Sequence, residues 1–103
     1  MVTLKQTADL MMGSDYKTRF YAEYWQTKIR YEKLNRTLIK AEAGTLPFTL
    51  TCPKELLAEQ AKYMGLYLYR LEVRAELENI DLYGEVPEAT STEADEEGHK
   101  WHN

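Results

Sequence analysis

Hydrophobic side chains recur along residues 15–43 at the spacing of a long α-helix. Alternating steps of four and three residues separate one series of positions: Phe20, Tyr24, Thr27, Tyr31, Leu34, Leu38 and Ala41. Such steps keep side chains on one seam of a helix. A second apolar stripe beside this seam consists of Tyr21, Trp25 and Ile29. The pattern therefore predicts a long helix with more apolar surface than a single neighbouring helix can cover.

The two ends of this helix carry recognisable signals. Ser14 suits the N-cap position, and Asp15 would place a negative charge at the positive end of the helix dipole. Gly44 can adopt the left-handed conformation in which many helices end. We therefore expect one continuous helix between residues 15 and 43.

A second long helix is predicted over residues 53–80. The same heptad spacing links Leu57, Ala61, Met64, Leu68, Leu71 and Ala75, so the two seams are expected to meet in an antiparallel hairpin. This helix also carries a second stripe: Leu66, Tyr69, Val73, Leu77 and Ile80. Because a lone chain would leave these stripes in water, the pattern predicts self-association into a homo-oligomer. Gly65, in the helix interior, indicates a close backbone approach, which we place at the same interface.

Two shorter segments complete the predicted domain. Residues 3–12 read as an amphipathic helix capped by Thr3, with one side that would cover the start of the long helix: Leu4, Ala8, Met11 and Met12. Residues 44–53 contain two prolines and are expected to form the turn, with Cys52 as the next N-cap and three apolar side chains tucked under the helix ends: Leu46, Phe48 and Leu50. The expected class is all-α, a short helix followed by a self-associating hairpin.

The end of the chain differs in composition from the rest. Residues 81–103 contain seven acidic residues and one lysine, a net charge of −6 within a chain whose total is −4. We predict a helical domain over residues 1–80 and a disordered acidic tail over residues 81–103. The long helix, by contrast, carries a net charge of +3 and half of the twelve aromatic residues. That field is too weak for duplex nucleic acid but suits a small anion.

Several function classes are not expected. The longest uncharged stretch is far shorter than a membrane span, and the chain opens without a signal sequence, which favours the cytoplasm of the host cell. A single cysteine, Cys52, allows no disulfide within the chain. As a nucleophile it would depend on His99 or His102 in the tail, and these two histidines alone make a poor metal site. We therefore expect no enzyme activity, no metal and no cofactor.

Two motifs on the predicted helices resemble those of a known family. The first helix carries Y-x-x-R-x-x-x-E from Tyr16 to Glu23, and the second carries Q-x-x-x-M-x-x-Y-x-x-x-L-x-x-R from Gln60 to Arg74. Over residues 14–76 the chain resembles a small phage-encoded family related to a crAss-like phage protein, which includes the anti-CBASS sponges. Those proteins bind cyclic oligonucleotide second messengers and so silence bacterial anti-phage signalling.

The resemblance implies a ligand and the residues that hold it. Sponges of this type assemble as dimers and hexamers and keep ligands at protomer interfaces without hydrolysing them. A cyclic di- or trinucleotide offers flat bases to aromatic side chains and phosphates to Arg and Lys. The candidates are four residues of the two motifs and two basic residues farther along the first helix, which could reach a phosphate from a neighbouring protomer: Tyr16, Arg19, Tyr67, Arg74, Lys28 and Arg30.

A different function fits the same residues. Tyrosines at helical spacing commonly pack in a core or an interface, and Arg19 and Glu23, four residues apart, can pair on the helix surface. The alternative is thus a helical protein–protein interaction module of a phage, an inhibitor or scaffold without a nucleotide ligand. A site that gathers tyrosine and arginine favours the sponge, whereas purely apolar contacts favour the module.

Overall fold

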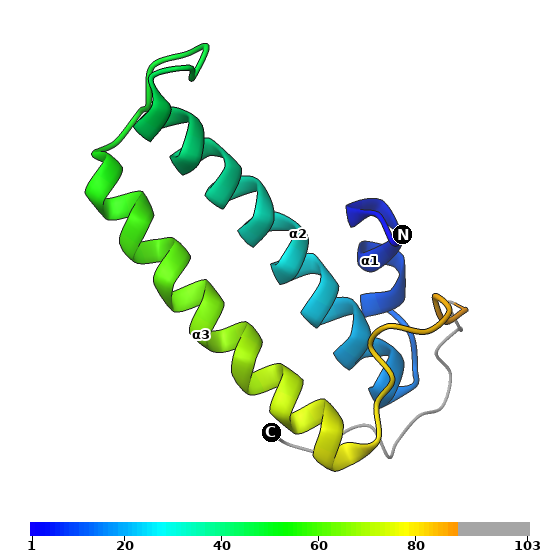
Figure 1. The fold of residues 1–103 in the computed structure, drawn as a ribbon. Helices are drawn as coiled ribbons and strands as arrows, with labels where there is room; N and C mark the ends of the chain where they lie inside the picture. Colours follow the sequence, from blue (N-terminus) through cyan, green and yellow to red (C-terminus); the bar gives the residue numbers. More distant parts are fainter. Residues whose placement is uncertain (89–103) are drawn as a thin grey trace.

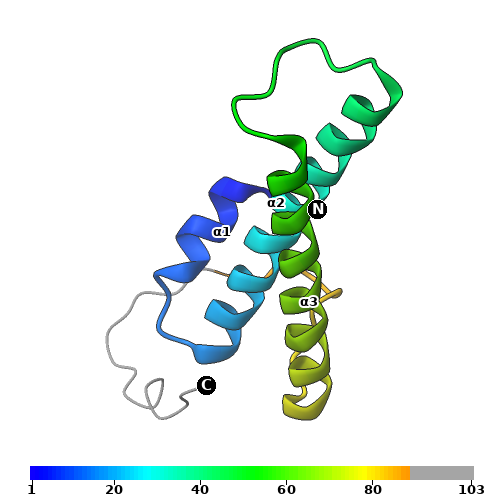
Figure 2. The ribbon, with the colours of Figure 1, turned by 90° about the vertical axis from the view of Figure 1, so that its left-hand side faces the viewer.

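The computed structural model describes residues 1–88, which form three α-helices and no strand (Figure 1). Helix α1 spans Leu4–Met11, α2 spans Tyr16–Ala43 and α3 spans Lys54–Glu78. Helices α2 and α3 form an antiparallel hairpin, and α1 packs against the first half of α2, as two views show (Figures 1 and 2). The all-α prediction is confirmed. None of the helices within this range combines the length and the apolarity needed to cross a bilayer.

The ends of α2 differ in one respect from the prediction. Asp15, not Ser14, is the N-cap, and its Oδ2 accepts hydrogen bonds from the backbone N–H of Thr18 at 3.2 Å and from the Thr18 hydroxyl at 2.9 Å. A carboxylate at this position both accepts the free N–H and faces the positive helix end. Gly44 ends the helix at φ 78°, as predicted.

Helix α3 is shorter at both ends than the predicted span. Pro53, not Cys52, is the N-cap, because the extended backbone of a proline (φ −61°, ψ 140°) suits the residue before the first helical turn. Asn79 ends the helix at φ 58°, a conformation that asparagine tolerates better than most residues. Ile80 therefore leaves the helix axis and turns back toward α2.

The hydrophobic core lies in the half of the hairpin nearest α1. The buried seam residues are Phe20 and Tyr24 of α2 and Ala61, Leu68, Leu71 and Ala75 of α3, which confirms that the two predicted seams meet. Toward the loop the packing loosens: Ile39 and Leu56 are exposed, and Phe48 is exposed rather than tucked under the helix ends. Gly65 faces Tyr31: a Cβ added at this glycine would lie 3.0 Å from the Tyr31 hydroxyl oxygen and 3.3 Å from the ring. Its close approach is thus made within the hairpin.

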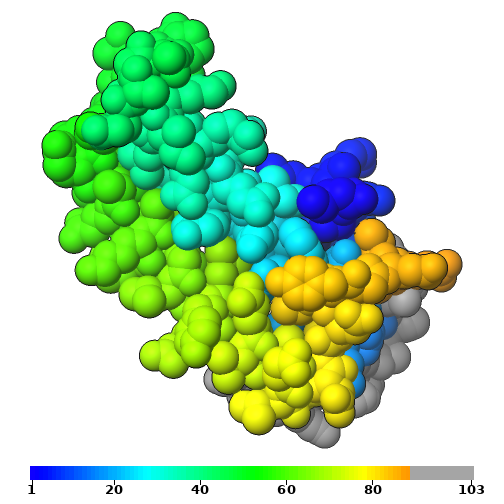
Figure 3. Space-filling view, viewed as in Figure 1, coloured from blue at the N-terminus to red at the C-terminus, as the bar shows by residue number. Residues whose placement is uncertain are grey.

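The second stripe of α2 is covered by the chain itself. Tyr21 and Trp25 are buried beneath α1 and a segment, residues 80–86, that we call the C-terminal strap. In the strap Leu82 is only 4% exposed, and its carbonyl accepts a 2.8 Å hydrogen bond from the Trp25 indole N–H. Figure 3 shows the strap lying against α2 between α1 and the end of α3.

The strap corrects the predicted domain boundary at residue 80. The high acid content of residues 81–103 concealed Leu82, which is buried, and Tyr83, whose hydroxyl lies 2.9 Å from that of Tyr24. The ordered packing therefore continues into the segment that we predicted to be a disordered tail. The rest of that segment, residues 89–103 with His99 and His102, lies outside the described residues.

Helix α1 covers α2 with a different face from the predicted one. Thr7 and Leu10 are buried, whereas Leu4 and Met11 are partly exposed and Met12 is 75% exposed. Burial of Thr7 costs little because its hydroxyl donates to the Leu4 carbonyl at 2.7 Å. The Thr3 cap is confirmed, with Gln6 completing a capping box.

The second stripe of α3 remains in solvent. Leu66, Tyr69, Val73 and Leu77 are 53%, 57%, 40% and 79% exposed, and together they form the outer face of α3, opposite the seam. Only the fifth predicted member, Ile80, is buried. The chain thus covers the surplus apolar surface of α2 but leaves that of α3 open.

Candidate functional site

A hydrogen-bonded cluster joins the start of α2 to the end of α3. The Tyr16 hydroxyl donates to Glu78 Oε1 at 2.7 Å and accepts from Arg74 Nη2 at 2.7 Å. Arg74 Nε also donates to Glu78 Oε2 at 3.3 Å, and its guanidinium lies 4.9 Å from the centre of the Phe20 ring. Tyr16 therefore shares one site with two side chains that lie 58 and 62 residues later in the sequence.

A second bridge on the same side of the hairpin joins Tyr67 to Glu23. The Tyr67 hydroxyl of α3 donates to the Glu23 carboxylate of α2. Glu23 lies seven residues after Tyr16, and Tyr67 lies seven residues before Arg74. Because the helices are antiparallel, a step of seven residues toward the C-terminus of α2 matches a step of seven residues toward the N-terminus of α3. Each step covers about 10 Å along the helix axis, at 1.5 Å per residue. The two sequence motifs are therefore paired with each other across the hairpin.

This side of the hairpin contains two residues that the sequence analysis missed. Tyr63 and Arg70 lie four residues before and three residues after Tyr67, on the same face of α3. Tyr63 is 57% exposed and Tyr67 is 42% exposed. The steps of four, three and four residues from Tyr63 to Arg74 place these side chains on one face of a helix, and this spacing could have identified them from the sequence. We call the combined surface the tyrosine–arginine edge, formed by Tyr16, Arg19, Tyr63, Tyr67, Arg70 and Arg74.

Of the six predicted ligand residues, four lie on the tyrosine–arginine edge. Arg19 belongs to it by its position one turn after Tyr16, and its Nη1 donates to the Gly13 carbonyl at 2.8 Å. Arg30 is exposed on the same side of α2, three turns beyond Arg19. Lys28 lies on the other side, because residues two apart on a helix point in nearly opposite directions, and its Nζ is 3.9 Å from Glu32. Lys28 therefore does not join this cluster.

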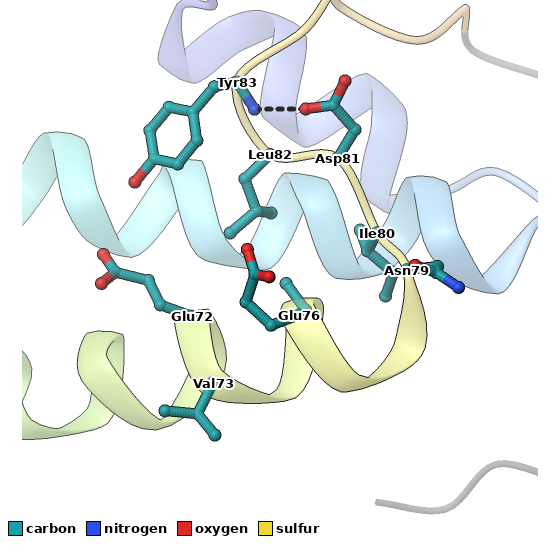
Figure 4. Close-up of a pocket in the computed structure, with 9 residues that line it drawn as sticks. Glu72, Val73, Glu76, Asn79, Ile80, Asp81, Leu82 and Tyr83 are labelled. Atoms are coloured by element: carbon teal, nitrogen blue, oxygen red, sulfur yellow. Dashed lines mark hydrogen bonds between the residues drawn. The ribbon is translucent and has the colours of Figure 1, made fainter.

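The opposite side of the hairpin has different chemistry. Here Tyr24 donates to Glu72 Oε2 at 2.6 Å, and its oxygen is 2.9 Å from the Tyr83 hydroxyl. A hollow of about 510 Å³ opens between α3 and the strap, and its polar lining is largely acidic (Figure 4), with Glu72, Glu76 and Asp81. Three carboxylates would repel a phosphate. This hollow therefore suits an anionic ligand less well than the tyrosine–arginine edge does.

Burial and the neighbouring carboxylates affect the tyrosines on both sides. Burial, followed by the hydrogen bond to Glu78, raises the pKa of Tyr16 above its usual 10.0, although the Arg74 charge opposes the rise. Burial, followed by the hydrogen bond to Glu72, raises the pKa of Tyr24 far above the same value. Both hydroxyls therefore stay protonated through the physiological range and act as hydrogen-bond donors to carboxylates.

We expect the stability of the chain to fall at alkaline pH. A folded-state pKa above the unfolded value means that the folded chain holds the proton more tightly. The contribution of Tyr24 to the free energy of unfolding is therefore complete below pH 10. Above pH 10 it is lost, at up to about 1.4 kcal/mol per pH unit. Urea unfolding at a series of pH values above 9 measures the slope of the free energy of unfolding against pH. Tyr24→Phe should make it shallower, and an unchanged slope in this variant would contradict the assignment.

Comparison with known proteins adds one match. The model of a protein family described as Sequestin matches residues 14–77. That span contains α2, the loop and all of α3 except its last residue, and therefore both motifs of the tyrosine–arginine edge. Helix α1 and the strap lie outside it. No curated protein and no solved structure matches the chain.

Proposed function

The chain belongs to the Sequestin family, and on that basis we propose that it is a phage anti-defence protein of the host cytoplasm that sequesters cyclic oligonucleotide second messengers. The proposed action is binding alone, without hydrolysis. A sponge of this kind lowers the free concentration of a signal by mass action, so it needs affinity and abundance but no bond-breaking step.

The observation that carries this proposal is the composition of the tyrosine–arginine edge. Its exposed rings, on Tyr63 and Tyr67, offer flat surfaces on which bases can stack. Arg70 and Arg74 follow on the same face of α3, and a guanidinium can form two parallel hydrogen bonds to the oxygens of a phosphate. A cyclic dinucleotide presents both of these chemical features within one small molecule.

We propose that two copies of the chain combine their edges. The outer face of α3 leaves four apolar side chains in solvent, and a second α3 can pack on it in antiparallel fashion. If Tyr69 lies at the two-fold axis, Leu66 of each copy meets Val73 of the other. Lys62 of each copy then lies beside Glu76 of the other, which is a complementary pair of charges.

This symmetry has a consequence for the ligand. The two α3 helices would lie side by side in one plane, with the two-fold axis perpendicular to that plane. Such an axis keeps the same side of each helix on the same face of the dimer. The two tyrosine–arginine edges would therefore adjoin. A ligand with two bases and two phosphates could then receive each type of contact twice.

The assembly is tested by Leu66→Glu. We expect this variant to remain monomeric at concentrations where the wild-type chain forms oligomers, because the substitution places two carboxylates in an apolar contact. Light scattering coupled to gel filtration measures the mass. Leu66 is already half exposed within one chain, so the helical circular dichroism should be unchanged. Ile39→Glu, on an exposed site of α2, is the matched control. A monomeric wild-type chain would contradict the proposal.

The function itself is tested by calorimetric titration with a panel of cyclic di- and trinucleotides, followed by recovery of the ligand. Uptake with intact ligand supports a sponge, and altered ligand would indicate an enzyme. Absence of binding across the panel would contradict the proposal and favour the alternative, a helical interaction module. Saturation at one ligand per two chains is expected if the two edges share a site.

A further inference from the structure

The Arg74 side chain already has an anion beside it, supplied by its own helix. Glu78 lies one turn after Arg74, and its two carboxylate oxygens accept from Arg74 Nε and from the Tyr16 hydroxyl. Arg74 Nη2 closes the ring by donating to Tyr16. Two donors from two different helices thus converge on one carboxylate. Arg74 and Tyr16 therefore hold a carboxylate of the protein between them.

We propose that Glu78 is a specificity-determining residue that competes with the ligand: its carboxylate occupies the anion site of Arg74 and Tyr16, and a phosphate of the bound nucleotide displaces it. This inference rests on the proposed function. It names the atoms whose hydrogen-bond partners change when the ligand binds. It also assigns a role to Glu78, which lies outside both motifs and outside the family match.

The chemistry of the exchange favours a phosphodiester. A carboxylate and a phosphodiester each carry one negative charge over two free oxygens, so Arg74 and Tyr16 can donate to either with the same geometry. Arg74 would keep an anionic partner throughout and would never be left with an unpaired charge. A neutral nucleoside cannot replace the carboxylate in this way. Glu78 therefore selects for charged ligands.

The side chain of Glu78 can move without disturbing the fold. About a third of its surface and of the Arg74 side chain is exposed, so solvent and ligand can reach the pair. Partly exposed ion pairs contribute little to stability, and rotation about side-chain bonds is fast. The displaced carboxylate can turn into water while Leu71 and Ala75, buried on the seam of the same helix, hold α3 in place.

The other tyrosine–carboxylate bridges lack one of these properties. Tyr67 donates to Glu23, and Tyr24 donates to Glu72, but no arginine bonds to either carboxylate among the contacts of residues 1–88. Displacement of Glu23 or Glu72 would free a tyrosine hydroxyl but no guanidinium that is hydrogen-bonded to the same carboxylate. Glu78 is therefore the carboxylate whose removal should change the affinity for an anion.

The test compares Glu78→Gln with two matched variants. The glutamine can still accept from Tyr16 but has no charge with which to hold Arg74. Wild type is first titrated with cyclic di-AMP, cyclic di-GMP and cyclic GMP–AMP to find the ligand that it binds best. We expect Glu78→Gln to bind that ligand three- to tenfold more tightly than wild type does. Glu85→Gln removes an equal charge from an exposed position of the strap, and Glu72→Gln alters the other side's tyrosine bridge. Both should bind as wild type does.

The outcomes separate the two proposals. Binding by wild type with no gain in Glu78→Gln would overturn the role of Glu78 and leave the proposed function intact. An equal gain in Glu85→Gln would show a general charge effect and would also overturn it. If wild type binds neither these three nor any cyclic trinucleotide of the panel, the proposed function fails with it. Circular dichroism verifies the fold of each variant, and Glu78→Ala, which has no acceptor at all, should also bind more tightly.

Discussion

Replacing Trp25 with alanine is expected to lower the free energy of unfolding by about 3–5 kcal/mol, the usual cost of removing a large buried aromatic side chain. The indole is 9% exposed and lies where α2 meets the strap. Its ring centre is 5.2 Å from that of Tyr24 and 5.8 Å from that of Tyr83, both in edge-to-face geometry. Its N–H is hydrogen-bonded to the Leu82 carbonyl. The alanine variant therefore loses the attachment point of the strap.

Urea unfolding followed by circular dichroism measures this effect. Trp25→Phe keeps an aromatic ring but leaves the Leu82 carbonyl without its donor, so a smaller loss of about 1–3 kcal/mol is expected. Ile39→Ala, at a site that is 66% exposed near the loop, should change the stability by less than about 1 kcal/mol. A loss below about 1 kcal/mol for Trp25→Ala would mean that the strap does not pack as described.

Replacing Arg74 with alanine is expected to weaken the binding of cyclic dinucleotides by about 10- to 100-fold, since a hydrogen bond to a charged group contributes roughly 1.5–3 kcal/mol. Arg74 is the residue of the tyrosine–arginine edge where the contacts converge: Tyr16, Glu78 and the face of Phe20 all touch it. Its removal takes away both the phosphate partner and the support for the Tyr16 hydroxyl. Calorimetric titration with the same panel measures the loss.

Two further variants make the Arg74 result specific. Arg74→Lys keeps the charge but loses the planar fork that can bond two oxygens at once, so an intermediate affinity is expected. Arg36→Ala removes an equal charge from an exposed position of α2 outside the edge and should bind as wild type does. Equal affinity for wild type and Arg74→Ala, with both folded, would place the ligand elsewhere.

The residues of the site could be predicted only in part. Tyr16, Arg19, Tyr67 and Arg74 were identified from their motifs, yet the motifs say nothing about which residue pairs with which. That Tyr16 bonds to Glu78, and Glu23 to Tyr67, depends on the register between two antiparallel helices. Lys28 and Arg30 were grouped because they are close in sequence. Their separation follows from helix geometry and could have been recognised.

The amino-acid sequence by itself determined the helices, their seams and the exposed stripe of α3, because helical periodicity is a local property set by neighbours three and four residues away. Only the tertiary structure decided which segments cover the second apolar stripe of α2. Leu82 reaches Trp25 across 57 residues, and no local pattern in an acidic segment indicates that contact. Likewise, Arg74 reaches the Tyr16 hydroxyl because α2 and α3 place their ends together, which depends on the packing of the whole hairpin.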